Sequence, residues 1–170
     1  RNPGWQLAAD AKKINPDLKV SILRWRTPAW VKKDEDRYIW YKQSILAAYE
    51  KYGYMVDYIN PNVNEAWSGA GDVKYTKKFA KWIAAESTAT IKDEKALELF
   101  RKIKLVVSDE ANVVSDSVAE TMKSDQEFMD AVDVVGYHYK TADDNNGGMK
   151  WLAEVVDKEV WNSEEQATFS

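Results

Sequence analysis

Short apolar segments alternate along this chain with segments of helical periodicity, and this alternation restricts the fold more than any other feature. Tyr41, Ile45, Ala48 and Tyr52 recur at steps of four, three and four, which predicts an amphipathic helix that stops at Gly53. Strands are expected over residues 19–25, 54–59, 104–108, 133–139 and 158–163, and helices over 4–15, 36–52, 73–86, 94–101, 117–131 and 149–157. Such βα units are typical of an α/β fold in which helices cover a parallel sheet.

Local signals suggest where some helices begin. Asp72 is a candidate N-cap for the helix expected from Val73. Ser117 with Glu120, and Ser124 with Glu127, both fit the capping-box spacing, so one helix or two short ones are expected between residues 117 and 131. The prolyl residue at position 61 predicts that the strand before it ends there and becomes a loop.

Composition excludes several classes of protein. The 170 residues contain no Cys and one His, which rules out disulfide scaffolds, thiolate zinc sites and Cys nucleophiles and leaves His138 as the one base for a Ser-His-Asp triad. Lys and Arg number 24 against 28 acidic residues, a net charge of −4 that gives no sign of nucleic-acid binding. No apolar run is long enough to span a membrane.

In parallel α/β folds the chemistry lies at the carboxyl ends of the strands. Two of the expected strands end near Glu, and four Trp lie at or near strand ends, a combination that suits a glycosidase because two carboxyl groups cleave the bond and aromatic faces pack on sugar rings. The polar and aromatic residues at these ends are Arg24, Trp25, Arg26, Trp30, Asn64, Glu65, Trp67, Asp109, Glu110, His138, Tyr139, Trp161, Ser163, Glu164 and Glu165.

Each of these residues also has a simpler interpretation. A Glu at a strand end is often a solvated loop residue, a Trp often packs in a core, and a lone His such as His138 in an apolar strand is often a hydrogen-bonded core or rim residue. No P-loop and no G-x-G-x-x-G pattern is present, so nucleotide binding has little support. Composition and periodicity alone predict an α/β domain, and activity on carbohydrate is one interpretation of it.

An ordered set of motifs narrows this further. Asn64-Glu65 resembles the fourth-strand motif of clan A glycoside hydrolases, and the segment 160–165, Val-Trp-Asn-Ser-Glu-Glu, resembles their seventh-strand motif. Together with segments 1–16, 23–30 and 133–139, these motifs resemble glycoside hydrolase family 59, the galactocerebrosidase-like β-galactosidases, in order along the whole chain. The resemblance implies a TIM, or (β/α)8, barrel.

The resemblance also implies roles for individual residues. Glu65 would be the acid/base and Glu164 the nucleophile of a retaining reaction, with Glu165 as the rival nucleophile because strand alternation lets only one of the two face the pocket. The residues implied to bind substrate are Trp25, Asn64, Trp67, His138 and Tyr139. Neither a metal nor a cofactor is required. The implied substrate is a β-linked galactoside, as glycolipid or oligosaccharide, and the implied location is extracellular or at the cell surface.

Departures from the family pattern leave alternatives open. Val63 precedes the Asn-Glu pair, where many relatives carry an aromatic residue, Pro61 is more similar to family 30, and Ala66 follows the pair where Pro is common. The alternatives are another clan A β-glycosidase of the family 30 kind, a non-catalytic carbohydrate-binding α/β domain, and a five-stranded doubly wound domain of unrelated function.

The length fits one domain, but a (β/α)8 barrel usually needs about 250 residues. We therefore expect residues 1–170 to form a partial catalytic barrel that holds strands three to seven, with no second domain. The rest of the barrel, and accessory β domains, would then be its partners in a longer chain. Alone, these residues are expected to be inactive and poorly stable, because open sheet edges would remain.

Overall fold

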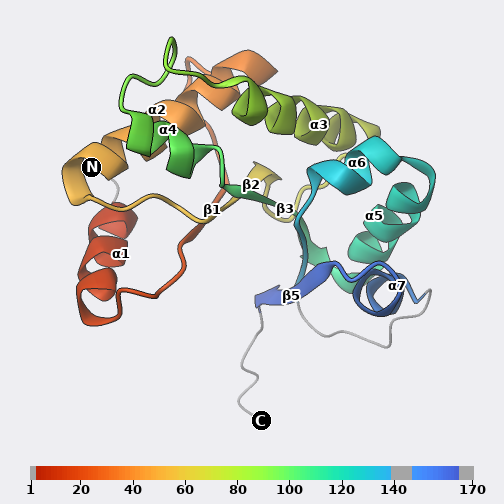
Figure 1. The fold of residues 1–170 in the computed structure, drawn as a ribbon. Coiled ribbons are helices and arrows are strands. Elements are labelled where there is room, and N and C mark those ends of the chain that lie inside the picture. Colours follow the sequence, from red (N-terminus) through yellow and green to blue (C-terminus); the bar gives the residue numbers. More distant parts are fainter. Residues whose placement is uncertain (1–2, 139–146, 165–170) are drawn as a thin grey trace. The chain divides into compact units, whose positions relative to one another are not determined.

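The structure is a computed structural model that describes residues 3–138 and 147–164. Helices and strands alternate along the chain as the sequence predicts (Figure 1). The strands are β1 (Ser21–Arg24), β2 (Tyr58–Val63), β3 (Lys104–Ala111), β4 (Val134–His138) and β5 (Glu159–Glu164). The helices are α1 (Pro3–Ile14), α2 (Asp34–Tyr52), α3 (Ala70–Ala85), α4 (Glu94–Phe100), α5 (Asn112–Ser124), α6 (Gln126–Ala131) and α7 (Gly148–Glu154).

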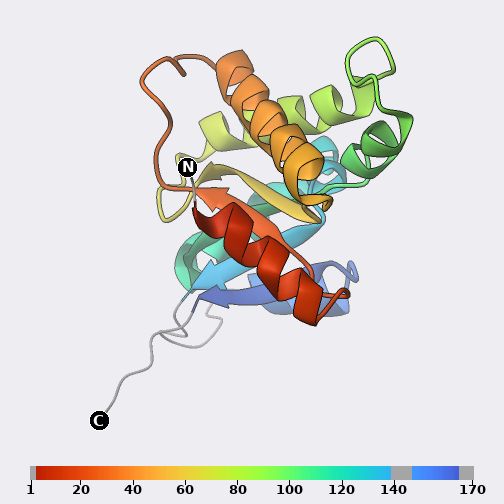
Figure 2. The same cartoon turned by 90° about the vertical axis from the view of Figure 1, so that its left-hand side faces the viewer.

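The strands form one sheet in the order β1-β2-β3-β4-β5, so each strand lies beside the one that precedes it in the chain. β3 pairs in parallel with β4, with Val106 opposite Val134, and β4 pairs in parallel with β5, with Val135 opposite Val160. Figure 2 shows β4 (cyan) and β5 (blue) side by side and pointing the same way. A doubly wound sheet reverses its strand order at a switch point, and this order does not reverse among the described strands. The fold is therefore a partial (β/α)8 barrel, which confirms the predicted class, and the doubly wound alternative is wrong.

Two irregularities interrupt the pairing near the carboxyl ends of the strands. Ser108 pairs with Gly136 and Glu110 with Tyr137, so Asp109 is an extra residue in β3. Tyr137 pairs with Asn162 and His138 with Glu164, so Ser163 is an extra residue in β5. Bulges of this kind turn side chains away from simple alternation and are frequent beside active sites.

One strand lies later in the chain than predicted. β2 begins at Tyr58 and runs through Pro61 to Val63, whereas the prediction placed it over 54–59 and ended it at the prolyl residue. Tyr54, Met55 and Val56 are buried but lie outside any strand. These residues are apolar because they are buried, and an apolar run by itself does not show whether a segment is a strand or a buried loop.

The helix-start signals were partly wrong. α5 begins at Asn112, so Ser117 lies inside it rather than at its start, and the second helix is capped by Asp125, whose side chain accepts a hydrogen bond from the Phe128 amide at 2.9 Å. Asp72 lies in the first turn of α3 and its carboxylate accepts hydrogen bonds from the Ser68 amide and hydroxyl. Of the two expected arrangements, one helix or two short ones, the structure shows two helices, α5 and α6. Several local patterns fit a cap, and the position where β3 ends decides among them.

Contacts divide the chain into two compact units. The first unit comprises residues 1–22, 27–59 and 81–103, and the second comprises 23–26, 60–80 and 104–170. The prediction of a single domain stays a prediction. Among the described residues, no helix has both the length and the apolar character that crossing a membrane requires.

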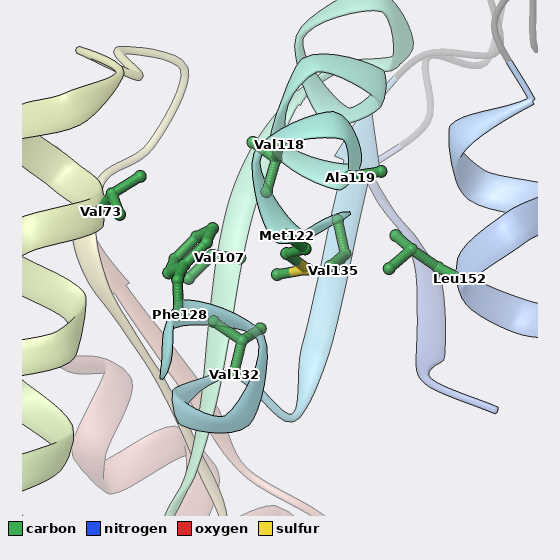
Figure 3. Packing of buried hydrophobic residues seen from close by; sticks show 9 residues of the cluster. All are labelled: Val73, Val107, Val118, Ala119, Met122, Phe128, Val132, Val135 and Leu152. Carbon is green, nitrogen blue, oxygen red and sulfur yellow. The ribbon is translucent and has the colours of Figure 1, made fainter. Parts of the chain in front are cut away.

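The core of the second unit lies between α5, α6 and α7 and the outer face of β3 and β4 (Figure 3). Val107 and Val135 point from the strands towards Met122 of α5 and Phe128 of α6, and all four are almost completely buried. Leu152 adds the face of α7. Burying a side chain of this size contributes about 1.5–3 kcal/mol, so this layer holds the two strands in place and fixes what their ends present.

A buried polar group ties the first unit together. The Glu86 carboxylate accepts a hydrogen bond from the Tyr38 hydroxyl at 2.6 Å and pairs with the Lys42 ammonium at 2.6 Å, and Thr90 donates a further hydrogen bond to it. Burial raises the pKa of Glu86, but the bonds from Lys42, Thr90 and Tyr38 outweigh it and hold the pKa below its ordinary value. Tyr38 and Lys42 lie on α2, so this carboxylate anchors that helix to the segment after α3.

Candidate active site

Glu65 stands just beyond the carboxyl end of β2, in a turn that neighbouring backbone holds. The amide of Asn64 donates to the carbonyl of Arg24 at 3.0 Å, and the amide of Glu65 donates to the carbonyl of Asp109 at 3.2 Å. Glu65 has a φ of 52°, in the left-handed region that residues other than Gly seldom adopt. Such strain persists where the surroundings impose it, and it is concentrated at functional sites.

Glu65, His138 and Glu164 come together at the ends of β2, β4 and β5. The Nδ1 atom of His138 lies 3.2 Å from Oε1 of Glu65 and 3.7 Å from Oε2 of Glu164. One ligand atom from each of the three residues lies within 4.8 Å of the others, so the two carboxylates approach each other to that limit. The imidazole is buried, whereas both carboxylates are partly open to solvent. All three residues belong to the second unit, and in sequence Glu164 is 99 residues after Glu65.

The same atoms define what this site could ligate. Two carboxylate oxygens and one imidazole nitrogen are donors that a divalent transition metal accepts. Without a metal, Nδ1 of His138 lies within hydrogen-bond distance of Glu65 and near Glu164. The prediction that no metal is needed stays a prediction.

Asn64 is the buried polar residue with the most unusual surroundings. Its side chain is 1% exposed, and neither its amide nitrogen nor its amide oxygen has a hydrogen-bond partner among the described residues. A buried amide left in this state costs free energy unless a ligand satisfies it. This amide, next to Glu65 in the sequence, therefore has both a donor and an acceptor available to a polar ligand.

The aromatic residues predicted to bind substrate divide into two groups. The Trp25 side chain directly follows β1 and is 58% exposed, so its face is available to a ligand. The Trp67 ring instead packs against Phe128, with ring centroids 6.2 Å apart, at the edge of the helical core. The structure therefore does not bring Trp67 into the group around His138. Tyr139, and the rival nucleophile Glu165, lie outside the described residues.

The sequence analysis did not predict Asp109 as a site residue, although Asp109 lies near the end of β3. The carboxyl group is buried and accepts hydrogen bonds from Asn60 Nδ2 at 2.6 Å and from Ser163 Oγ at 2.5 Å. The bulge that turns it inward has no signature in one sequence. The position of Asp109 at the end of an apolar strand was the available signal, and neighbouring Glu110 shared it; Glu110 instead accepts a hydrogen bond from the Trp67 amide.

The carboxyl groups of Glu65 and Glu164 lie at the ends of β2 and β5, and β3 and β4 lie between these strands. Two carboxyl groups placed in this way in a partial (β/α)8 barrel are typical of the glycoside hydrolase class. Comparison with known proteins specifies the family. The sequence matches the family described as glycosyl hydrolase family 59 over residues 1–170, and the chain belongs to this family.

Curated relatives agree with this assignment. The chain is 26% identical to galactocerebrosidase from Mus musculus over 175 residues and 28% identical to galactocerebrosidase from Salmo salar over 177 residues. Each alignment covers 98% of this chain and 22% of the relative, so the chain spans about a fifth of the length of these proteins. Among solved structures, that of SrfJ from Salmonella typhimurium superposes with a TM-score of 0.70 at 18% identity, covering 98% of this chain and 40% of that chain, which supports the fold.

Proposed function

We propose that the protein to which this chain belongs is a retaining β-galactosidase of the galactocerebrosidase kind. The observation that carries the proposal is the approach of Glu65 and Glu164 to within 4.8 Å around His138 at the carboxyl ends of the strands. Retaining enzymes hold their two carboxyl groups about 5–5.5 Å apart, whereas inverting enzymes need about 6.5–9.5 Å to admit a water molecule. The short separation supports retention.

In the proposed reaction Glu164 attacks the anomeric carbon and forms a glycosyl-enzyme. Glu65 protonates the departing oxygen and then takes the proton from the water that releases the sugar. The Nδ1 atom of His138 lies within hydrogen-bond distance of Glu65, at 3.2 Å, and 3.7 Å from Glu164. The orphaned amide of Asn64 gives a buried donor and acceptor for a sugar hydroxyl, and the exposed face of Trp25 suits an apolar sugar face.

The proposed substrate is a terminal β-galactoside carried by a lipid or an oligosaccharide. It rests on the family and on the names of the relatives. The same proposal includes further barrel strands, elsewhere in the longer protein, that complete the pocket. It also includes a location outside the cell or at its surface.

The test measures hydrolysis of aryl β-galactosides by the natural full-length protein and its variants. Glu164→Gln removes the nucleophile, so turnover should fall by several orders of magnitude with every leaving group. Glu65→Gln should lower the rate of the glycosylation step about 10²–10⁴-fold with a phenyl galactoside, because phenolate needs protonation to depart. With a dinitrophenyl galactoside the fall in this rate should be much smaller, because dinitrophenolate departs without protonation. Proton NMR should show the β-anomer of galactose as the first product.

Glu159→Gln is the matched control, because it is the same change at the exposed opposite end of β5. It should leave turnover unchanged. Wild-type activity in Glu164→Gln would overturn the nucleophile assignment and return attention to Glu165. A wild-type protein that binds galactosides without cleaving them would favour a carbohydrate-binding domain, and preferential cleavage of another β-glycoside would favour the family 30 alternative.

A further inference from the structure

Asp109 occupies a position that neither packing nor substrate binding explains. It lies in the bulge near the end of β3, with a φ of 51°, and follows Ser108, whose φ is 73°. Two successive residues other than Gly in the left-handed region are costly. Its side chain is 5% exposed, so the carboxyl group is buried.

The Asp109 carboxyl group accepts hydrogen bonds from two other strands and lies near a residue of a third. One oxygen, Oδ2, accepts a hydrogen bond from Asn60 of β2 at 2.6 Å. The other, Oδ1, accepts one from Ser163 of β5 at 2.5 Å and lies 3.9 Å from Nε2 of His138 in β4. Both carboxylate oxygens therefore have partners. These partners lie in β2, which Glu65 follows, in β4, which contains His138, and in β5, which contains Glu164.

The space for this carboxyl group depends on Gly136 of β4. A Cβ atom at Gly136 would lie 2.1 Å from Oδ1 of Asp109 and 2.8 Å from Oγ of Ser163. The carboxyl group and the Ser163 hydroxyl thus fill the volume that a side chain would otherwise occupy. Residues of β2, β4 and β5 therefore surround this carboxyl group.

Each connection leads to one of the two proposed catalytic residues. The backbone carbonyl of Asp109 accepts the amide of Glu65, which fixes the turn that presents the acid/base. Ser163 immediately precedes Glu164, so a bond from Asp109 to Ser163 fixes the bulge that presents the nucleophile. His138, which contacts both carboxylates, has its other ring nitrogen directed towards Asp109.

We propose that Asp109 is a positioning residue that sets the separation of Glu65 and Glu164. This inference rests on the proposed function, because it assigns Asp109 to the reaction that those two residues perform. A carboxylate accepts from both neighbours, whereas an amide in its place would either lose the bond from Asn60 or make the Ser163 hydroxyl accept instead of donate, which changes the contact at the bulge. Misplacement of reacting groups by about 1 Å can cost on the order of 100-fold in rate.

The test compares Asp109→Asn and Asp109→Ala with Asp133→Asn in the full-length protein. Asp133 is the matched control because its carboxylate also bridges β3 and β4, accepting the Leu105 amide at 2.8 Å, but at the opposite end of these strands. We expect kcat on aryl β-galactosides to fall by about 10–100-fold in Asp109→Asn and further in Asp109→Ala, with KM within about threefold of wild type. Asp133→Asn should lower Tm without changing kcat.

The outcomes of these measurements support or overturn the inference as follows. Wild-type kcat in folded Asp109→Asn, or an equal loss of kcat in Asp133→Asn, would overturn the inference. If Asp109→Asn does not fold, Ser163→Ala removes one donor and leaves the carboxyl group in place; reduced kcat with unchanged KM supports the inference, and wild-type kcat overturns it. Glu164→Gln is run beside these variants. If it retains wild-type activity, the nucleophile assignment fails and this inference fails with it, whereas an inactive Glu164→Gln with a fully active Asp109→Asn overturns the positioning role alone. A wild-type protein that cleaves no aryl β-galactoside would overturn the proposed function itself.

Discussion

His138 shows how one residue can satisfy both a structural and a functional interpretation. From sequence it was either a hydrogen-bonded residue at the rim of the core or part of a sugar pocket. In the structure its ring is buried and its Nδ1 atom faces two carboxylates. Its partners come from strands that are distant in sequence, so composition and periodicity could not choose between the two interpretations, and the motif resemblance was needed to name Glu65 and Glu164.

Gly136 gives the sharpest prediction for a single residue. Gly136→Ala places a methyl group where Asp109 and Ser163 now lie, and overpacking of this kind costs about 1–3 kcal/mol. We expect a lower free energy of unfolding in urea together with a fall in kcat, because the displaced groups are those that hold Glu164. Gly71→Ala is the control: it lies in α3, its added Cβ meets only the Ser68 hydroxyl at 3.2 Å, and alanine favours the helix. A wild-type kcat in Gly136→Ala would contradict the close packing described here.

Elements were predicted well where periodicity and stop signals agreed. α2 has buried Tyr41, Ile45 and Ala48 at helical spacing and ends at Gly53, which has a φ of 75°, as the sequence indicates. Prediction failed where one signal had two physical meanings. The apolar residues before β2 are buried but lie outside any strand, and the Ser117 capping pattern lies inside α5. Neither pattern indicates where a strand begins or ends, so neither could place the boundary of the element correctly.

At the start of α6, one carboxylate both caps the helix and carries an ion pair. Asp125 accepts the Phe128 amide at 2.9 Å and pairs with Lys77 of α3 at 2.8 Å. The hydrogen bond from Lys77, together with the amide, lowers the pKa of Asp125. Asp125→Ala removes both interactions and should cost about 1 kcal/mol, most of it from the cap, because partly exposed ion pairs contribute little.

Asp125→Asn is the matched comparison, because Asn is also a good N-cap but carries no charge. Its free energy of unfolding in urea should lie within a few tenths of a kcal/mol of wild type. If Asp125→Asn were as unstable as Asp125→Ala, the ion pair rather than the cap would hold α6.

Across the whole molecule, each compact unit contains a carboxylate that its partners keep ionised. These are Glu86 in the first unit and Asp125 in the second, and the pKa of each lies below its ordinary value. The stabilisation from such a group is complete above its unfolded-state pKa and disappears as the pH falls through the lower, folded-state pKa. Both units should therefore lose stability in acid, starting below about pH 5.

Glu86 should contribute more to this loss, because its side chain is buried and accepts bonds from Tyr38, Lys42 and Thr90. At pH 7, Glu86→Gln should lower the free energy of unfolding by about 1.5–3 kcal/mol, since hydrogen bonds to a charged group are lost and Lys42 is left without its counter-charge. As the pH falls below the unfolded-state pKa of Glu86, its lowered pKa stabilises the folded protein less, so the difference in free energy of unfolding between the two proteins should be smaller at pH 3 than at pH 7. Urea titrations at the two pH values measure this. Glu120→Gln is the control, because it breaks an exposed ion pair with Lys123. Its free energy of unfolding should be close to that of wild type at both pH 7 and pH 3. A difference that stayed constant from pH 7 to pH 3 would mean that Glu86 stabilises the first unit by its shape and not by its charge.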